Sequence, residues 1–112
     1  SFSAPVAGTI STSQSSSGYE LIDIALHVNG SPHGALRIRL RGVPQDGGVV
    51  MTASGVTFVP QTTGTLYSGT VSSLQGTDIG AVVRDGSGAV LDLNLSLSID
   101  NVTRVVSGTV TA

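Results

Sequence analysis

Apolar and polar residues alternate with a period of two along much of this chain. The pattern is clearest over residues 91–99, where four leucines and one isoleucine at odd positions alternate with polar residues at even positions. Residues 22–28 and 36–40 repeat it, with apolar side chains at even positions. Because successive side chains of a strand point to opposite faces, each segment is predicted to be a strand with one buried and one wet face.

The segments 22–28 and 36–40 are predicted to form a hairpin joined by residues 29–34, which are rich in turn-forming residues. A slip of one residue would bury the arginines between the apolar positions, so the register must keep both apolar sets on one face. The expected pairs are Val28 with Leu36, Leu26 with Ile38 and Ile24 with Leu40, which also place Asp23 opposite Arg41 and His27 opposite Arg37.

A second hairpin is predicted around the turn at residues 85–88, Asp-Gly-Ser-Gly. Its expected pairs are Ile79 with Leu95, Ala81 with Leu93 and Val83 with Leu91. Weaker patterns predict further strands at 6–13, 49–54, 56–59, 65–74 and 104–111. Gly-Thr-Ile or Gly-Thr-Val begins at Gly8, Gly69 and Gly108, an echo consistent with a duplication of residues 8–41 and 69–100.

These segments predict a single all-β domain covering residues 1–112, with about eight or nine antiparallel strands. Two arrangements satisfy the pattern. We favour two sheets packed face to face as a β-sandwich, and the alternative is one sheet closed into a β-barrel.

Arg37, Arg39 and Arg41 occupy alternate positions of one predicted strand, about 6.6 Å apart. Such a row can match carboxylates or phosphates on a partner, although cross-strand pairing with neighbours such as Asp23 would satisfy part of it. An ordinary solvated face is the other interpretation. Tyr19 and Tyr67 are the remaining candidates for binding, because Phe58 is expected in the core.

His27 and His33 are the only histidines, and the first predicted hairpin could bring them together. With Asp23 or Met51 they could bind copper or zinc, but nothing in the sequence fixes a third ligand. We therefore expect no metal site and no cofactor, and keep His27 as a candidate binding residue.

Composition limits the functional classes. The net charge is −2, all five cations are arginine, and charged residues make up only 11% of the chain, which argues against nucleic-acid binding. The absence of cysteine excludes thiol catalysis, and the familiar serine-hydrolase, zinc-protease and phosphate-loop motifs are missing, so we expect no enzyme. No apolar stretch reaches 18 residues and no leader pattern begins the chain, so membrane insertion of this segment is not expected.

A surface rich in Ser, Thr and Gly but without Lys is typical of secreted bacterial β modules, and predicts an extracytoplasmic location. The run 67–76, then residues 89–93 and 107–110, resembles small Ser/Thr-rich β domains on the outer side of bacterial membrane redox proteins of the ferric-reductase-like kind. Those proteins hold haem or flavin in other domains. The resemblance, which covers less than half of the chain, therefore implies an accessory module.

Three functions follow as hypotheses. The first is a noncatalytic accessory or interaction module of a bacterial cell-surface or membrane-anchored protein, with a protein partner or self-association. The second is a surface-filament subunit whose first strand completes a neighbour's sheet. The third is a small-ligand carrier, if the sheet closes around a cavity.

Overall fold

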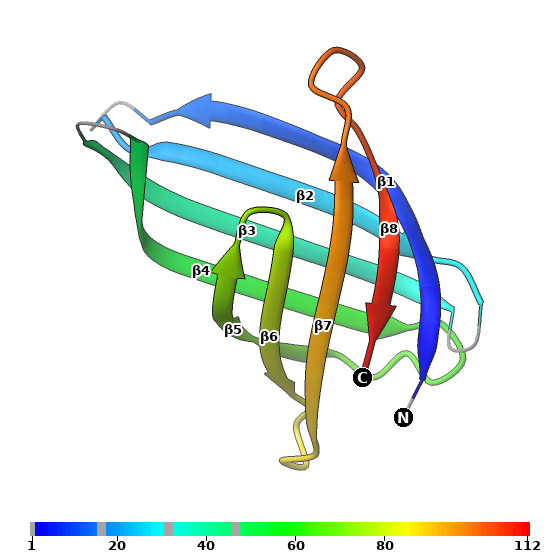
Figure 1. The fold of residues 1–112 in the computed structure, drawn as a ribbon. Helices are drawn as coiled ribbons and strands as arrows, with labels where there is room; N and C mark the ends of the chain where they lie inside the picture. Colours follow the sequence, from blue (N-terminus) through cyan, green and yellow to red (C-terminus); the bar gives the residue numbers. More distant parts are fainter. Residues whose placement is uncertain (1, 16–17, 31–32, 46–47) are drawn as a thin grey trace.

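The fold is built from eight β-strands joined in chain order. A computed structural model describes residues 2–15, 18–30, 33–45 and 48–112, and in that part of the chain there are strands and turns but no helix. The strands are β1 (Ser3–Gln14), β2 (Glu20–Val28), β3 (Gly34–Gln45), β4 (Gly48–Pro60), β5 (Tyr67–Gln75), β6 (Asp78–Arg84), β7 (Val90–Ile99) and β8 (Val105–Thr111) (Figure 1).

The sheet closes on itself. Every strand pairs antiparallel with the next one along the chain, and β1 also pairs with β8, giving a closed barrel. The all-β antiparallel class is confirmed, with the barrel alternative in place of the favoured sandwich. A sandwich would leave some strands at sheet edges, whereas each strand here, including β1, has a hydrogen-bonded neighbour on both sides.

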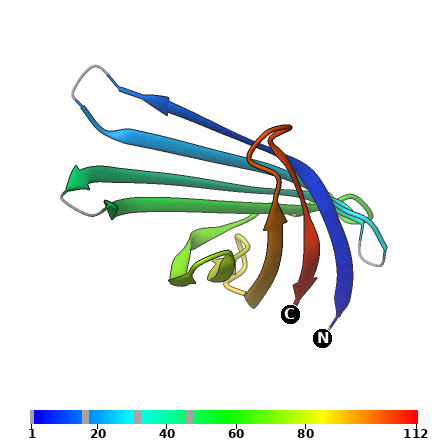
Figure 2. The same ribbon diagram turned by 45° about the horizontal axis from the view of Figure 1, so that its top comes forward.

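The strands of the barrel form two groups that run in different directions. Strands β1–β4 run across the view of Figure 1, and β5–β8 cross them at a steep angle; Figure 2 shows the same two groups from a tilted viewpoint. On one side the two groups are joined by few backbone pairs, because β4 and β5 share only three. These are Val56 with Gly69, Thr57 with Ser68 and Phe58 with Tyr67. Beyond these pairs, the Val71 amide donates to the Ser54 hydroxyl over 3.0 Å.

Inward-facing side chains fill the barrel. They come from seven of the strands in the alternation that the sequence predicts, and no polar or charged side chain of the described residues is buried with them. The buried set is Ala4, Val6, Ile24, Leu26, Val28, Leu36, Ile38, Val56, Phe58, Ile79, Ala81, Val83, Leu93, Leu95, Leu97, Val106 and Val110.

The two predicted hairpins differ in outcome. In the β6–β7 hairpin all three expected pairs are confirmed. In the β2–β3 hairpin the face of each residue is correct, but the register is shifted by two residues: Leu26 pairs with Leu36, Ile24 with Ile38 and Ile22 with Leu40. Gly34 takes the place opposite Val28.

This shift has a packing reason. The expected register would have left Ile22 opposite Gly42, whereas the observed one gives Ile22 a large apolar partner, Leu40. A two-residue shift keeps every side chain on its own face, so the arginines stay outside in either register. As a result Asp23 lies opposite Arg39, not Arg41, and His27 lies opposite Ala35, not Arg37.

The segments 49–54 and 56–59 were expected to be separate strands and are instead one, β4. Gly55 does not interrupt it, since Gly55 pairs with Arg39 of β3. The irregularity lies nearby, where Arg41 pairs with Ala53 and Gly42 with Met51. Thr52 is the extra residue of this bulge, and its hydroxyl donates to the Arg41 carbonyl oxygen over 3.2 Å.

The echoed glycines mark places where adjacent strands approach closely. Gly8, Gly69 and Gly108 all occupy inward-facing positions of their strands, and a methyl group on any of them would overlap a carbonyl oxygen of the neighbouring strand. The repeated glycine therefore has a structural role in the curvature of the barrel.

The first and last described segments lie together. The Phe2 amide donates to the Ala112 carbonyl oxygen over 3.1 Å, and the Ala112 amide donates to the Phe2 carbonyl oxygen over 2.9 Å. Figure 1 shows the two ends side by side at one edge of the barrel.

Candidate binding site on the arginine face

Three arginines project from the outer surface of β3. Arg37, Arg39 and Arg41 alternate with the inward-facing Leu36, Ile38 and Leu40, and all three are exposed. We call the outer surface of β1–β4 around this row the arginine face. What each guanidinium can do there depends on its neighbours.

Arg37 is neutralised by Asp23 of β2. Its Nε and Nη2 donate to the two carboxylate oxygens over 2.9 and 2.6 Å, a bidentate arrangement. The hydrogen bonds from Arg37 lower the pKa of Asp23, partly opposed by burial, and the same pair raises the pKa of Arg37. Arg37 is therefore already engaged within the protein.

Arg39 remains largely available. It lies directly opposite Asp23, but its Nε is 4.0 Å from the nearest carboxylate oxygen, and its side chain is 66% exposed. Since Asp23 is already bound by Arg37, the donors of Arg39 can turn toward a molecule outside the barrel.

Arg41 is held by an aromatic ring. Its guanidinium carbon lies 3.8 Å from the ring centroid of Tyr19, which is a cation–π contact. Tyr19 is fixed in the connection between β1 and β2, because its amide donates to the Ser15 hydroxyl and its carbonyl oxygen accepts from the Ser15 amide. Stacking leaves the edge of the guanidinium, which carries its N–H donors, free to contact an acceptor.

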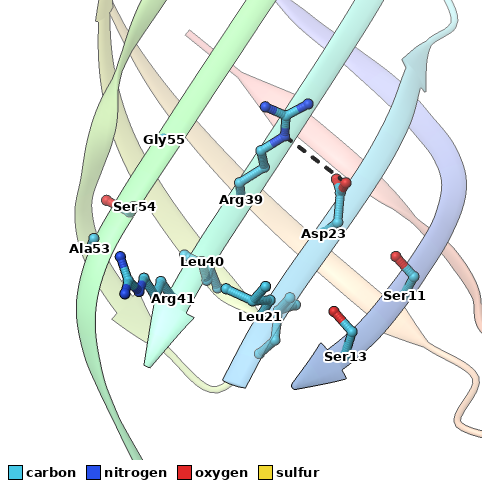
Figure 3. Close-up of a pocket in the computed structure, with 11 residues that line it drawn as sticks. Ser11, Ser13, Leu21, Asp23, Arg39, Leu40, Arg41, Ala53, Ser54 and Gly55 are labelled. Carbon is cyan, nitrogen blue, oxygen red and sulfur yellow. Dashed lines mark ion pairs between the residues drawn. The ribbon is translucent and has the colours of Figure 1, made fainter. Parts of the chain in front are cut away.

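A pocket of about 380 Å³ lies between Arg39 and Arg41 (Figure 3). The register explains its shape, because two rows cross the four strands there, Ser11–Asp23–Arg39–Gly55 and Ser13–Leu21–Arg41–Ala53. Strands β1 and β4 contribute only small side chains to these rows, and the larger side chains are on β2 and β3. The half-buried Ile22 and Leu40 also line the pocket.

The predicted binding residues are thus only partly brought together. Arg37, Arg39, Arg41 and Tyr19 share the arginine face, and His27 lies on the outer surface of β2 toward its other end. Tyr67 is elsewhere: it is half-buried, and its ring packs against Phe58 with centroids 6.2 Å apart.

The expected approach of the two histidines is observed, with 3.0 Å between their Nε2 atoms. Neither residue considered as a third ligand joins them. Asp23 is bound to Arg37, and Met51 pairs with Gly42 near the far end of β3. Among the described residues, no group of three or more His, Cys, Asp or Glu side chains is placed to hold a metal ion.

The small residues that border the pocket were not predicted from the sequence. Ser11 and Ser13 of β1 and Ala53 and Gly55 of β4 occupy alternate outer positions, and a methyl group on Gly55 would meet no atom within 4 Å. The signal was a run of small residues at outer positions of two predicted strands. This signal indicates a pocket only when the two strands are known to lie on either side of the arginines.

Comparison of the chain with protein-family models, curated proteins and solved structures found no match. In the described part of the chain, no helix has the length and apolar character needed to cross a membrane.

Proposed function

We propose that this domain is a noncatalytic interaction module that docks an acidic segment of a protein partner on the arginine face. It would serve as an accessory part of a bacterial cell-surface or membrane-anchored protein, outside the cytoplasm, as the Ser/Thr-rich, Lys-free composition suggests. The observation that carries the proposal is the pair of available guanidiniums, Arg39 and Arg41, on either side of one pocket.

The geometry favours carboxylates as the partner groups. Arg39 and Arg41 are separated by one residue on one strand, a spacing of about 6.6 Å that matches acidic side chains at alternate positions of an extended segment. Arginine binds carboxylates through paired, charge-assisted hydrogen bonds. The hydroxyls of Ser11 and Ser13 border the same pocket and can donate or accept beside them.

The arginine face also has the composition of a protein-binding surface. Arg and Tyr are enriched among the residues that dominate binding energy at interfaces, and both meet in the Arg41–Tyr19 contact. Small neighbours such as Ala53 and Gly55 allow a partner backbone to approach closely. Two available cations on a chain of net charge −2 are too few for a polyanion such as nucleic acid.

The other two hypotheses have less support. Strand exchange in a filament would require β1 to give up its pairing with β2 or β8. An interior ligand would have to displace the packed side chains that fill the barrel. The acidic partner can also be a second copy of this chain, because Asp78 and Asp92 on the opposite half of the barrel are exposed acidic groups.

The test uses hexaglutamate as the probe and follows backbone amides of the whole domain by NMR. We expect saturable shifts at Ser11, Ser13 and Gly55, and about tenfold weaker binding for both Arg39→Ala and Arg41→Ala, as expected from losing one charge-assisted pair. Arg84→Ala is the charge-matched control, because Arg84 is exposed on β6 in the other half of the barrel. It should bind as the parent does.

A second variant, Gly55→Trp, fills the pocket without changing charge. It should abolish the shifts at Ser11 and Ser13 if the partner enters between the arginines. Equal weakening by Arg84→Ala and Arg39→Ala would instead mean nonspecific attraction and would overturn the proposal. Loss of monomer at high protein concentration, reversed by Arg39→Ala, would identify a second copy as the acidic partner.

A further inference from the structure

The two histidines form a close pair at one end of β2. His27 points outward from β2, and His33 lies in the connection just before β3. Their Nε2 atoms are 3.0 Å apart, their ring centroids are 4.4 Å apart, and the ring planes are at 85°. The Nε2 nitrogens, which can bind a proton or a metal ion, therefore lie within hydrogen-bond distance of each other.

This separation suits two ligands of one metal ion. Imidazole nitrogen binds such ions at about 2.0–2.1 Å, so two bonds at the right angle of a square-planar ion place the nitrogens about 2.9 Å apart, and two bonds at a tetrahedral angle place them about 3.3 Å apart. A hydrogen bond between two neutral imidazoles gives a similar distance. The experiment below separates the two explanations.

The connection that carries His33 is anchored at both ends. The Asn29 amide donates to the Pro5 carbonyl oxygen over 2.8 Å, which ties the start of the connection to β1. The Gln61 amide donates to the His33 carbonyl oxygen over 2.6 Å, which ties its end to the residue after β4. Such anchoring reduces the conformational entropy that ligand binding would otherwise cost.

The surroundings leave room and charge for a cation. His27 pairs with Ala7 of β1 and Ala35 of β3, so both flanking side chains on the outer surface are single methyl groups. Arg37, the next outward residue of β3 after Ala35, is turned toward Asp23 and neutralised by it. A metal ion at the histidine pair would therefore meet little repulsion.

We propose that His27 and His33 chelate one divalent first-row transition-metal ion through their Nε2 atoms. Imidazole suits copper, nickel and zinc, and Cu²⁺ binds most tightly among the divalent ions of this row. Because the described residues offer no third side-chain ligand, water fills the remaining positions. The site is separate from the proposed docking of an acidic partner and does not depend on it.

The experiment titrates Cu²⁺ into the full chain without a histidine tag, by calorimetry and electron paramagnetic resonance. We expect one ion per chain with two coordinated imidazole nitrogens in the spectrum. His27→Ala and His33→Ala should each weaken binding about 100-fold, at the low end of the gain from linking two binding groups. Glu20→Gln is the control, because Glu20 lies at the end of β2 away from His27, and this variant should bind Cu²⁺ as the parent does.

Each result is decisive for one explanation. If either histidine variant binds Cu²⁺ as tightly as the parent, the pair is only a hydrogen bond and the proposal fails. An equal loss in Glu20→Gln would also overturn it, because the ion would then be held elsewhere on β2. Both histidines are at the surface, so amide spectra of the metal-free variants should match the parent and exclude misfolding as the cause of lost binding.

Discussion

At the scale of single residues, Asp23 determines which arginines of the arginine face remain available to a partner. Its carboxylate takes both of its strong hydrogen bonds from Arg37, although Arg39 is the residue directly opposite. One arginine is thereby neutralised and two are left available. The sequence placed these residues on one face, but it could not specify this choice, because both arginines are within reach of Asp23 once the strands pair.

The Asp23–Arg37 pair predicts a pH-dependent contribution to stability. Its effect lowers the pKa of Asp23 below the ordinary value of 3.8, so the folded state favours the charged carboxylate. The stabilisation is therefore fully present above pH 3.8 and is lost as the pH falls through the lower pKa of the folded state. Asp23→Asn should lower the urea midpoint slightly at pH 7, and the difference from the parent should disappear in acid.

The measurement is urea unfolding of both proteins from pH 7 down to about pH 2. Asp92→Asn removes an exposed carboxylate from β7 and is the charge-matched control. If both variants differ from the parent by the same amount at every pH, the pair with Arg37 has no special role.

At the scale of strands and hairpins, the sequence was most informative where alternation was long and turns were short. The turn at residues 85–88 leaves little freedom, and Asp85 fixes it by accepting hydrogen bonds from Ser87 and from the Ala89 amide. The β6–β7 register could therefore be predicted. The longer connection before β3 permits registers two residues apart, and alternation cannot distinguish them because both keep the arginines outside.

Glycine positions give a sharp test of strand packing. A methyl group at Gly8 would overlap the Ala25 carbonyl oxygen, and one at Gly69 would overlap the Val82 carbonyl oxygen. Gly8→Ala and Gly69→Ala should each destabilise the barrel by about 1–3 kcal/mol, the usual cost of overpacking. Gly55→Ala meets open space and should be neutral or stabilising by less than about 1 kcal/mol.

Thermal and urea unfolding of the three variants measure these differences. Equal stability of Gly8→Ala and Gly55→Ala would show that the strands can separate at Gly8 without loss, contrary to the close approach described here.

At the scale of the whole molecule, the closure between β1 and β8 was the least predictable feature. It joins segments about 100 residues apart, and a sandwich satisfies the same alternation of buried and exposed side chains. The pocket depends on the same long-range arrangement, since Ser11 of β1 and Gly55 of β4 reach it from opposite sides of the arginines. Local patterns predicted the row of arginines but not the small residues that border the pocket beside it.

The barrel should tolerate new chain termini beside the two strands that share the fewest backbone pairs. A circular permutant that joins residue 112 to residue 1 through a short linker and opens between Thr62 and Thr63 cuts an exposed turn beside the three-pair β4–β5 contact. It should keep the parent's β-sheet circular dichroism. A permutant opened between Gly86 and Ser87 should be less stable, because it breaks the turn that Asp85 holds.

Equal stability of the two permutants by urea unfolding would contradict this ranking. It would mean that the Asp85 turn contributes no more to the fold than the connection after β4.

The pairing of Phe2 with Ala112 also determines how the molecule would respond to mechanical load. A force applied between these two residues acts across antiparallel strands at their shared end, so it opens the β1–β8 ladder one rung at a time, like a zipper. Rupture by this route needs far less force than sliding one strand along another, where all the rungs resist together. Under tension, this barrel would open first between β1 and β8, the pairing that closes the sheet.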